Sequence, residues 1–273
     1  MAEPGSTPSF RADQPGDSEH QALLVSILDA QSALPGVRRL RRWTLDALAV
    51  RPGDRVIDIG SGTGSEVVAL AALAGPTGAA TGVDPNPAML VEAEARATAL
   101  GVRAEFVKGD AYNLPFPDAS IDAVRCERVY QHLDDPARAT AEIARVLRPG
   151  GRVVLVDSDW STGIIHPGDP EVVRALNDSW LSQTTNHDSG RHLRGLLTAA
   201  GLVVDDIGAD AVIWDLGIID TMYRASTDHA VAAGAITAEQ RDQLIADLRH
   251  GVEIGDYHFS VTMFAVLAHR PDQ

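Results

Sequence analysis

The chain has 273 residues, of which 45% are hydrophobic and 22% are charged, and its formal net charge is −15. At about 150 residues per domain, this length fits one large domain or one domain with a substantial insertion. The composition is that of an ordinary globular protein and excludes collagen-like, coiled-coil and wholly disordered chains. A phosphate-binding surface needs a positive field, so the acidic balance argues against nucleic acid and against an anionic membrane as partners.

The sequence carries no recognisable targeting or metal-binding signal. Residues 1–8 have neither a basic start nor an apolar run, so we expect no secretory signal. The longest uncharged stretch, Val67 to Val83, has 17 residues and is interrupted by glycine and proline, which makes it too short to span a bilayer. The single cysteine, Cys126, allows neither an internal disulfide nor a thiolate zinc site. We therefore predict a cytoplasmic monomer or homodimer without a metal site.

The first fifty residues predict a tail followed by two helices. Residues 1–17 are rich in proline, glycine, serine and charge, which is typical of a disordered tail. Apolar residues at helical spacing begin near Glu19, Pro35-Gly36 interrupts them, and a second amphipathic helix runs up to Arg51. The arginines at 38, 39, 41 and 42 of this second helix fit a solvated face better than an anion site. We expect residues 18–50 to form a helical lid.

From residue 53 onward, short apolar runs alternate with alanine-rich helical segments. The predicted strands cover residues 55–59, 80–83, 104–107, 121–124 and 152–156. The predicted helices between them cover residues 66–74, 87–100 and 136–147. This alternation indicates a parallel sheet with crossover helices on both faces, which places a doubly wound α/β core at about 53–160.

The remainder of the chain is less regular. Helices are predicted at 170–181, 191–200, 217–233 and 238–250, and a strand region at 202–214. Residues 259–268 alternate and lack acidic and basic residues, as a late strand that joins the sheet does. We expect residues 161–273 to supply helical insertions together with the last strands of the same sheet.

The strongest motif is an apolar strand, residues 56–59, that runs directly into glycines at 60, 62 and 64 and then into a helix. Glycine lets the backbone turn sharply and lets a ligand approach without a Cβ in the way. A dinucleotide fingerprint requires its third glycine at position 65, which is Ser65 here. The spacing therefore argues against a nicotinamide enzyme.

Acidic residues stand at the ends of three predicted strands. Asp84 is suited to accept both hydroxyl protons of a ribose. Taken alone, an acidic residue at this place fits a helix cap or a turn, but together with the glycine loop it favours a ribose-binding role. Asp110, within Gly109-Asp110-Ala111, is suited to bond the exocyclic amine of an adenine. Asp58 lies inside a strand that should be buried, where an unpaired carboxylate is costly, so we expect it to serve a functional site or a polar network.

Taken together, these residues resemble the class I S-adenosylmethionine-dependent methyltransferases, in particular the small-molecule, ubiquinone/menaquinone-biosynthesis-like branch (methyltransferase type 11). The resemblance covers about residues 50–160 and rests on the glycine loop, Asp84, residues 109–111 and the segment Leu147–Gly151. It implies S-adenosyl-L-methionine as the cofactor, bound by residues 51–160. It also implies a Rossmann-like α/β fold, with a doubly wound, mostly parallel seven-stranded sheet, an N-terminal helical cover and helical insertions near the C-terminus.

The resemblance also implies roles for individual positions. Gly60 and Gly62 face the methionine portion of the cofactor, with Asp58 beside its amino group. Asp84 then binds the ribose, Asp110 and Ala111 bind the adenine, and Glu127 lies close to the sulfonium. The predicted cofactor residues are Gln31, Asp58, Gly60, Ser61, Gly62, Gly64, Asp84, Pro85, Met89, Gly109, Asp110, Ala111 and Glu127.

Methyl transfer from a sulfonium is a direct displacement, so the protein has to hold a nucleophile in line in a dry site. A hydroxyl acceptor also has to lose its proton. We predict His132 as the base, because its segment follows the fourth strand on the ligand side of the sheet; the alternative is a structural histidine at a helix start. Asp157 and Asp159, at the end of the fifth strand, are expected to orient this histidine or to bind the acceptor.

Aromatic residues concentrate in the C-terminal part of the chain, at Trp160, Trp180, Trp214, Tyr223, Tyr257 and Phe259. They indicate a small apolar or aromatic acceptor, with packing of the inserted helices as the alternative. The predicted function is methylation of a hydroxyl oxygen in natural-product tailoring. The alternatives are an enzyme of the same fold that binds the cofactor without methylating, such as a cyclase or hydroxylase, and a protein or RNA methyltransferase, against which the acidic charge counts.

Overall fold

The computed structural model describes residues 18–214 and 226–272. Within them the chain forms two compact units, each assembled from several segments. Of the described residues, 39–157, 189–209 and 264–272 form one unit, which we call the core unit. Residues 18–38, 158–188, 210–214 and 226–263 form the other, which we call the accessory unit. The predicted disordered tail, residues 1–17, lies outside the described residues.

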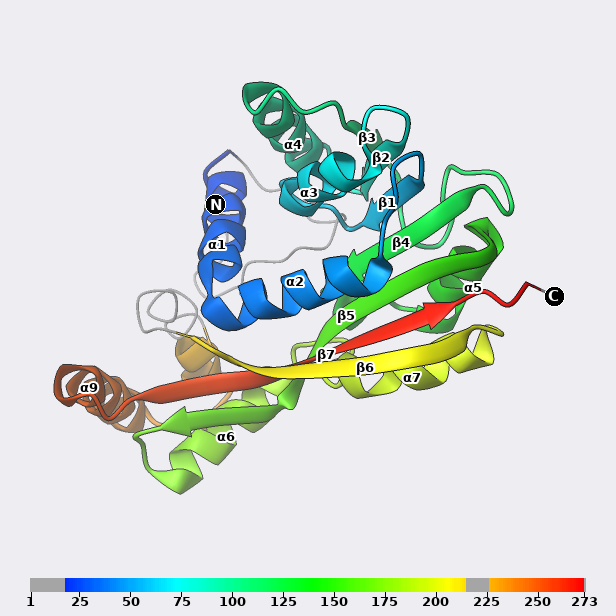
Figure 1. Ribbon diagram of the computed structural model, residues 1–273. Coiled ribbons are helices and arrows are strands. Elements are labelled where there is room, and N and C mark those ends of the chain that lie inside the picture. The colour runs from blue at the N-terminus through cyan, green and yellow to red at the C-terminus, as the bar shows by residue number, and fades with distance from the viewer. Residues whose placement is uncertain (1–17, 215–225, 273) are drawn as a thin grey trace. The chain divides into compact units, whose positions relative to one another are not determined.

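Seven strands form one sheet in the order β3-β2-β1-β4-β5-β7-β6 (Figure 1). They are β1 Arg55–Ile59, β2 Ala79–Asp84, β3 Glu105–Lys108, β4 Ile121–Glu127, β5 Leu147–His166, β6 Val203–Ile213 and β7 His258–His269. The pairs β1/β2, β1/β4, β2/β3 and β4/β5 are parallel. The chain order reverses between β1 and β4, which is where ligands bind in open α/β sheets. The predicted seven-stranded, doubly wound fold is confirmed.

Three crossover helices connect the parallel strands of the core unit: α3 Ser65–Ala74, α4 Pro87–Ala99 and α5 Pro136–Val146. Local sequence starts two of them in the same way. Asn86 and Asp135 accept hydrogen bonds from backbone N–H groups in the first turns of α4 and α5, and a proline follows each cap. These caps fix the first residues of both helices, with two residues between β2 and α4 and a short connecting segment between β4 and α5.

The interior of the core unit is built from aliphatic strand residues and the inner faces of the helices. Ile57, Ile59, Val124 and Leu155 belong to one buried cluster, which Ile143 of α5 also joins. Strands of a parallel sheet are covered on both faces, so their sequences are almost continuously apolar. Against that background, the charged residues Asp58, Arg125 and Glu127 within β1 and β4 stand out.

The remaining helices are α1 Ser18–Ala33, α2 Pro35–Leu48, α6 Pro170–Leu181, α7 Ser189–Ala199 and α9 Ala238–Ile254, and residues 226–232 are helical as well. These positions agree with the predicted helices, except that residues 217–225 of one prediction lie outside the described residues. Pro35 separates α1 from α2 because it starts the second helix, where its missing N–H is not needed. Among the described helices, none is long and apolar enough to cross a membrane.

One strand departs from its prediction. The sequence predicts a strand at 152–156, whereas β5 runs from Leu147 to His166. The strand pattern is not visible in the sequence at either end of β5. Gly150, with φ of 71°, and Gly151 interrupt its beginning, and serine, aspartate and threonine interrupt the apolar pattern in its second half. As a result, β5 contributes residues to both compact units.

Candidate active site

The glycine loop joins the end of β1 to the start of α3. Gly60, Gly62 and Gly64 have φ angles of 70°, 50° and 77°, a left-handed backbone that other residues rarely adopt. A Cβ added to Gly60 would lie 2.3 Å from Cγ2 of Val129, so the loop packs directly on the segment that follows β4. The hydroxyl of Ser61 is buried and has no hydrogen-bond partner among the described residues. A buried hydroxyl without a partner is costly and is suited to a ligand.

Asp84, the last residue of β2, fastens this loop. Its carboxylate accepts hydrogen bonds from the backbone N–H of Gly62 at 2.8 Å and from that of Asn86 at 2.9 Å. Burial raises the pKa of Asp84, and these two backbone hydrogen bonds oppose that rise. The cap of α4 is Asn86, so the helix-cap interpretation of Asp84 is wrong in detail, although the residue does stabilise a turn.

The next predicted positions lie on neighbouring elements of the core unit. Pro85 follows β2 and is partly buried, and Met89 is buried on α4. Beyond β3, Asp110 is exposed and accepts hydrogen bonds from the backbone N–H groups of residues 112 and 113, while Ala111 is buried. Gly109 has no room for a side chain, because an added Cβ would lie 2.9 Å from Val83. Pro85 and residues 109–111 therefore lie just beyond two adjacent strand ends, and Met89 lies in the first turns of the helix that follows β2.

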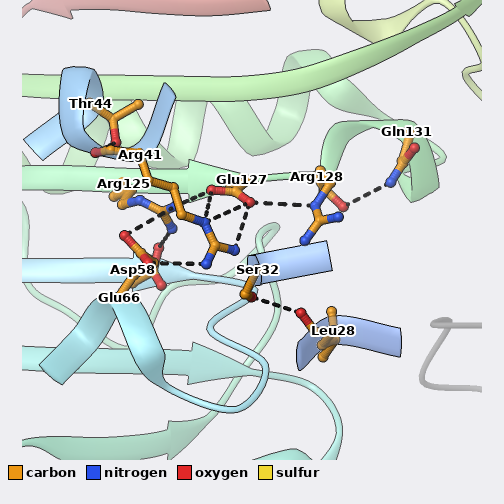
Figure 2. A network of polar contacts seen from close by, with 10 residues as sticks. All are labelled: Leu28, Ser32, Arg41, Thr44, Asp58, Glu66, Arg125, Glu127, Arg128 and Gln131. Carbon is orange, nitrogen blue, oxygen red and sulfur yellow. Dashed lines mark hydrogen bonds and ion pairs between the residues drawn. The ribbon is translucent and has the colours of Figure 1, made fainter. Parts of the chain in front are cut away.

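A network of buried charges connects the ends of β1 and β4 (Figure 2). Arg125 donates to Asp58 from Nη1 at 2.9 Å and contacts Glu127 and Glu66 with Nη2. Arg41 of α2 binds Glu127 through two nitrogens, at 3.2 and 3.1 Å from Nε and 2.9 Å from Nη2, and Glu66 through Nη1 at 3.2 Å. The Nε of Arg128 lies 3.5 Å from Oε1 of Glu127. With it, the network contains three arginines and three carboxylates.

The network gives its carboxylates different proton affinities. Burial raises the pKa of Asp58 to about 6, even though Arg125 opposes the rise. Burial also acts to raise the pKa of Glu127, but Arg41, Arg125 and Arg128 outweigh it and hold that pKa well below its ordinary value. Glu127 is thus ionised throughout the physiological range, whereas Asp58 titrates close to its lower end.

The structure corrects the interpretation of the arginines on the second helix. Arg38, Arg39 and Arg42 are exposed, as a solvated face requires. Arg41 does not follow them, because its side chain is 16% exposed and two carboxylates bind it. The expectation of a wholly solvated face is therefore wrong at this position. By contrast, Cys126 is the small buried residue that the sequence predicts, and burial raises the pKa of its thiol.

His132 ends a short 3₁₀ helix, η1 Tyr130–His132, and is partly buried. The fully buried carboxylate of Asp157 accepts a hydrogen bond from the backbone N–H of Gln131 at 3.0 Å. Asp157 thereby stabilises the turn that carries His132. Asp159 belongs to the accessory unit, where it accepts hydrogen bonds from the backbone and the hydroxyl of Ser161.

The accessory unit contains two other groups of predicted residues. Gln31 is buried on α1, and its contact with the cofactor stays a prediction. Trp160, Trp180, Trp214 and Phe259 form a closed ring of aromatic contacts, with centroid separations of 5.1 to 6.3 Å. The indole N–H of Trp214 is buried and has no hydrogen-bond partner among the described residues. Tyr257 is partly buried, and Tyr223 lies outside the described residues.

Comparison with known proteins identifies the family. The family model described as "Methyltransferase domain" matches residues 57–155, which contain the glycine loop, Asp84 and the charged residues of β4. The chain belongs to this family. It is a class I S-adenosylmethionine-dependent methyltransferase domain. The resemblance, the enzyme class and the cofactor inferred from the sequence are confirmed.

Two relatives and one solved structure place this methyltransferase more closely. An uncharacterized 37.1 kDa protein in transposon TN4556 of Streptomyces fradiae is 35% identical over 248 residues, which cover 89% of this chain and 70% of that protein. The ubiquinone/menaquinone biosynthesis C-methyltransferase UbiE of Ectopseudomonas mendocina is 36% identical over 145 residues, 52% of this chain and 54% of that protein. The YcgJ protein of Bacillus subtilis shares the fold with a TM-score of 0.60 at 25% identity, over 86% of this chain and all of that one. The matched region spans about half the length of the ubiquinone/menaquinone relative.

The sequence interpretation of this methyltransferase missed Arg41, Arg125, Arg128 and Glu66. One signal was available for Arg125, because an arginine inside the apolar run of β4 has to be buried with counter-ions. No local signal distinguishes Arg41 from the exposed arginines beside it. Its partner Glu127 is 86 residues away along the chain, and only the fold brings the two together.

Proposed function

We propose that this domain transfers a methyl group from S-adenosylmethionine to a hydroxyl oxygen of a small, apolar or aromatic metabolite in natural-product tailoring. The observation that carries the cofactor part is the buried hydroxyl of Ser61, which has no partner on a glycine loop that Asp84 fastens. The glycine loop follows β1, the strand beside which the sheet order reverses toward β4, and Asp84 ends the neighbouring strand β2. A ligand that supplies a hydrogen-bonding atom to Ser61 removes the cost of its burial.

The residues of the core unit fit the cofactor by chemistry. Asp58 is a carboxylate near the end of β1 and is suited to an ammonium group. Glu127, at the end of β4, keeps its proposed place near the sulfonium, although Arg41, Arg125 and Arg128 already balance its charge. Asp84 is suited to the ribose hydroxyls and Asp110 to the adenine amine, and Gly109 and Ala111 are the small residues on either side of Asp110. Gly60, Gly62 and Gly64 present backbone without side chains, and Pro85 and Met89 supply apolar surface beyond β2.

When bound, the cofactor supplies an activated methyl group on sulfur. The chain itself has to orient the acceptor, exclude water and remove the acceptor's proton. We assign proton removal to His132. The hydrogen bond from Gln131 to Asp157 supports this role, because it stabilises the short helix that ends at His132. Asp157 is in this view a positioning residue that acts through the backbone.

The acceptor class rests on the aromatic ring of the accessory unit. Three of the chain's four tryptophans and one phenylalanine are packed together there. Aromatic surface favours flat apolar molecules, and the indole N–H of Trp214 requires a hydrogen-bond acceptor. A hydroxylated aromatic metabolite offers both a flat apolar ring and a hydrogen-bond acceptor. The ubiquinone/menaquinone relative is named as a C-methyltransferase, so the atom that receives the methyl group has to be measured.

The deciding experiment incubates the purified protein with S-adenosylmethionine and a panel of phenolic, quinol, amine and carboxylate compounds and measures S-adenosylhomocysteine. We expect turnover with a phenolic or quinol compound and, by nuclear magnetic resonance of the product, an O-linked methyl group. A C-linked methyl group would overturn the oxygen assignment alone. Conversion of the acceptor without S-adenosylhomocysteine would instead support a cyclase or hydroxylase.

We also propose that residues 18–50 cover the cofactor and that Gln31 contacts it. Two short helices joined at Pro35 cannot bury a core of their own, and an activated methyl group has to be kept from water. Hydrogen exchange is expected to show these residues more protected once S-adenosylhomocysteine is bound. Equal protection with and without it would make them a fixed structural layer.

A further inference from the structure

We propose that Arg125 is a positioning residue of the cofactor site, which holds Asp58 ionised and oriented to receive the ammonium group of the cofactor's methionine portion. The inference rests on the proposed function, because it takes the role of Asp58 from there. It adds a residue that contacts no substrate and acts through another side chain.

The first step of the argument is the placement of Arg125. It lies in the middle of β4, is 2% exposed and is the direct parallel partner of Asp58 on β1. Adjacent residues of paired strands point to the same face of a sheet, so the guanidinium reaches Asp58 without bending the chain. A buried arginine is costly without counter-ions, and this one has three carboxylates around it.

The second step is the dependence of Asp58 on Arg125. Among the described residues, Arg125 is the one cation within ion-pair distance of Asp58. Glu127 differs, because Arg41 binds it through two nitrogens and Arg128 adds a third contact. Loss of Arg125 therefore leaves Glu127 paired but leaves Asp58 buried beside two other carboxylates, Glu66 and Glu127.

The third step concerns proton affinity. Burial already raises the pKa of Asp58 to about 6, and Arg125 opposes that rise. The groups that face Asp58 from the packed elements are Arg125, Cys126 and Glu127 of β4 and Glu66 of α3. Without Arg125 the pKa of Asp58 rises further, because the remaining neighbours do not favour its charge. At neutral pH the carboxyl then carries a proton and no longer attracts an ammonium group.

A further observation concerns the guanidinium itself. The Nε of Arg125 is buried and has no hydrogen-bond partner among the described residues. A buried donor without a partner is rare in folded proteins and is consistent with a polar ligand near Arg125.

The test measures affinity by calorimetry for two probes over pH 5 to 9. S-adenosylhomocysteine carries the amino-acid part, whereas 5′-methylthioadenosine lacks it. For Arg125→Met we expect the affinity for S-adenosylhomocysteine at pH 7 to fall roughly 10- to 100-fold, the loss of one hydrogen bond to a charged group. The affinity for 5′-methylthioadenosine is expected to stay within about 2-fold, which a merely structural defect would not spare.

The pH profile supplies an independent readout. In the wild type, affinity for S-adenosylhomocysteine falls as the pH drops through about 6, because Asp58 becomes protonated. In Arg125→Met the midpoint moves up by about 1 to 3 pH units, and in Arg125→Lys, which keeps the charge, it moves less. Arg241→Met serves as the matched control, since Arg241 pairs with Asp228 and Asp242 in the accessory unit.

The outcomes separate the two proposals. A wild-type protein that does not bind S-adenosylhomocysteine overturns the proposed function, and with it this inference. A wild-type protein that binds, together with an Arg125→Met variant of unchanged affinity and midpoint, overturns the role of Arg125 alone. If Arg125→Met does not fold, the Asp58→Asn variant is measured instead. Its affinity for S-adenosylhomocysteine is expected not to fall near pH 6, because the side chain that takes up a proton there is gone. A fall that persists in Asp58→Asn overturns the inference.

Discussion

The two compact units of this methyltransferase bury different chemistry. The core unit buries Arg125 between Asp58 and Glu127, with Arg41 and Glu66 closing the network. The accessory unit packs four aromatic side chains into a ring, of which Trp214 and Phe259 are buried and Trp160 and Trp180 are partly buried. The indole N–H of Trp214 has no hydrogen-bond partner among the described residues. Charge is therefore concentrated in one unit's interior, and aromatic area in the other's.

The two interiors differ in how much their geometry can change. A buried charge has to keep its counter-ions at fixed distances, because an unpaired ion costs several kcal/mol, so the network holds one geometry. An apolar cluster tolerates changes of shape for about 1–3 kcal/mol each. The proposed function assigns the charged site of fixed geometry to the cofactor and the more adaptable aromatic cluster to the acceptor. The predictions below test this division, from the largest expected effect to the smallest.

The largest effect is expected at His132. Replacement of a general base costs about 100-fold or more in turnover, so His132→Ala is expected to lower kcat about 100-fold. The affinity for S-adenosylhomocysteine, measured by calorimetry, is expected to stay unchanged, because the network at β1 and β4 is intact. His166→Ala is the control, since His166 is exposed and pairs with Asp256.

A His132→Ala protein that is less stable but equally fast would contradict the prediction. In that case the histidine only supports the short helix at the end of β4. The search for a base would then move to Asp157 and Asp159, of which Asp157 already bonds to that helix.

A smaller effect is expected at Asp84. Asp84→Ala removes a carboxylate that is proposed to bind two ribose hydroxyls and that also fastens Gly62. Loss of these charge-assisted hydrogen bonds costs about 2–4 kcal/mol, which weakens cofactor binding by about 30-fold or more. Calorimetric titration with S-adenosylhomocysteine measures the change, with Asp118→Ala, an exposed carboxylate paired with Arg145, as the control.

Unchanged affinity in a folded Asp84→Ala protein would reject the ribose assignment. Asp84→Asn is a milder change at the same place. The amide keeps one oxygen for either the Gly62 or the Asn86 N–H and turns its NH2 toward the other, so its loss of affinity is expected to be smaller than that of Asp84→Ala and to combine the loop and the ribose contact.

The parts of the site that the sequence predicted are those with a local cause. Glycines at 60, 62 and 64 predict a sharply turning loop, which the structure forms with a left-handed backbone, and the apolar run before Asp84 predicts the end of a strand. The signal in each case spans fewer than about ten residues, so it survives without knowledge of the fold.

The parts that the sequence did not predict depend on register. Asp58 and Arg125 are 67 residues apart and meet only because β1 and β4 pair in parallel with these two residues opposite each other. Arg41 is one of several arginines on its helix, and the rotation of α2 decides which of them is buried. The second half of β5 was missed because residues 158–162 are mostly polar, and Ser158 and Asp159 are buried there without an apolar alternation that would predict a strand.

The smallest effect is expected at Trp214, and it tests the other side of the comparison. Trp214 is 3% exposed, and its ring contacts Trp160 and Phe259 at centroid separations of 6.3 and 6.1 Å. Trp214→Phe keeps an aromatic ring in the cluster and removes the indole N–H. If that N–H pairs with the acceptor, the acceptor's Kd is expected to rise about 3- to 10-fold, the value of one neutral hydrogen bond.

The measurement uses the acceptor found by S-adenosylhomocysteine formation and follows the quenching of tryptophan fluorescence, which three clustered tryptophans dominate. Trp43→Phe is the matched control, because Trp43 lies on α2 and packs against Gly208 in the core unit. Cofactor affinity is expected to stay unchanged in both variants, since neither changes the charge network. A Trp214→Phe protein that binds the acceptor as tightly as the wild type would show that the aromatic ring is packing alone. The acceptor would then have to be sought beside His132 in the core unit.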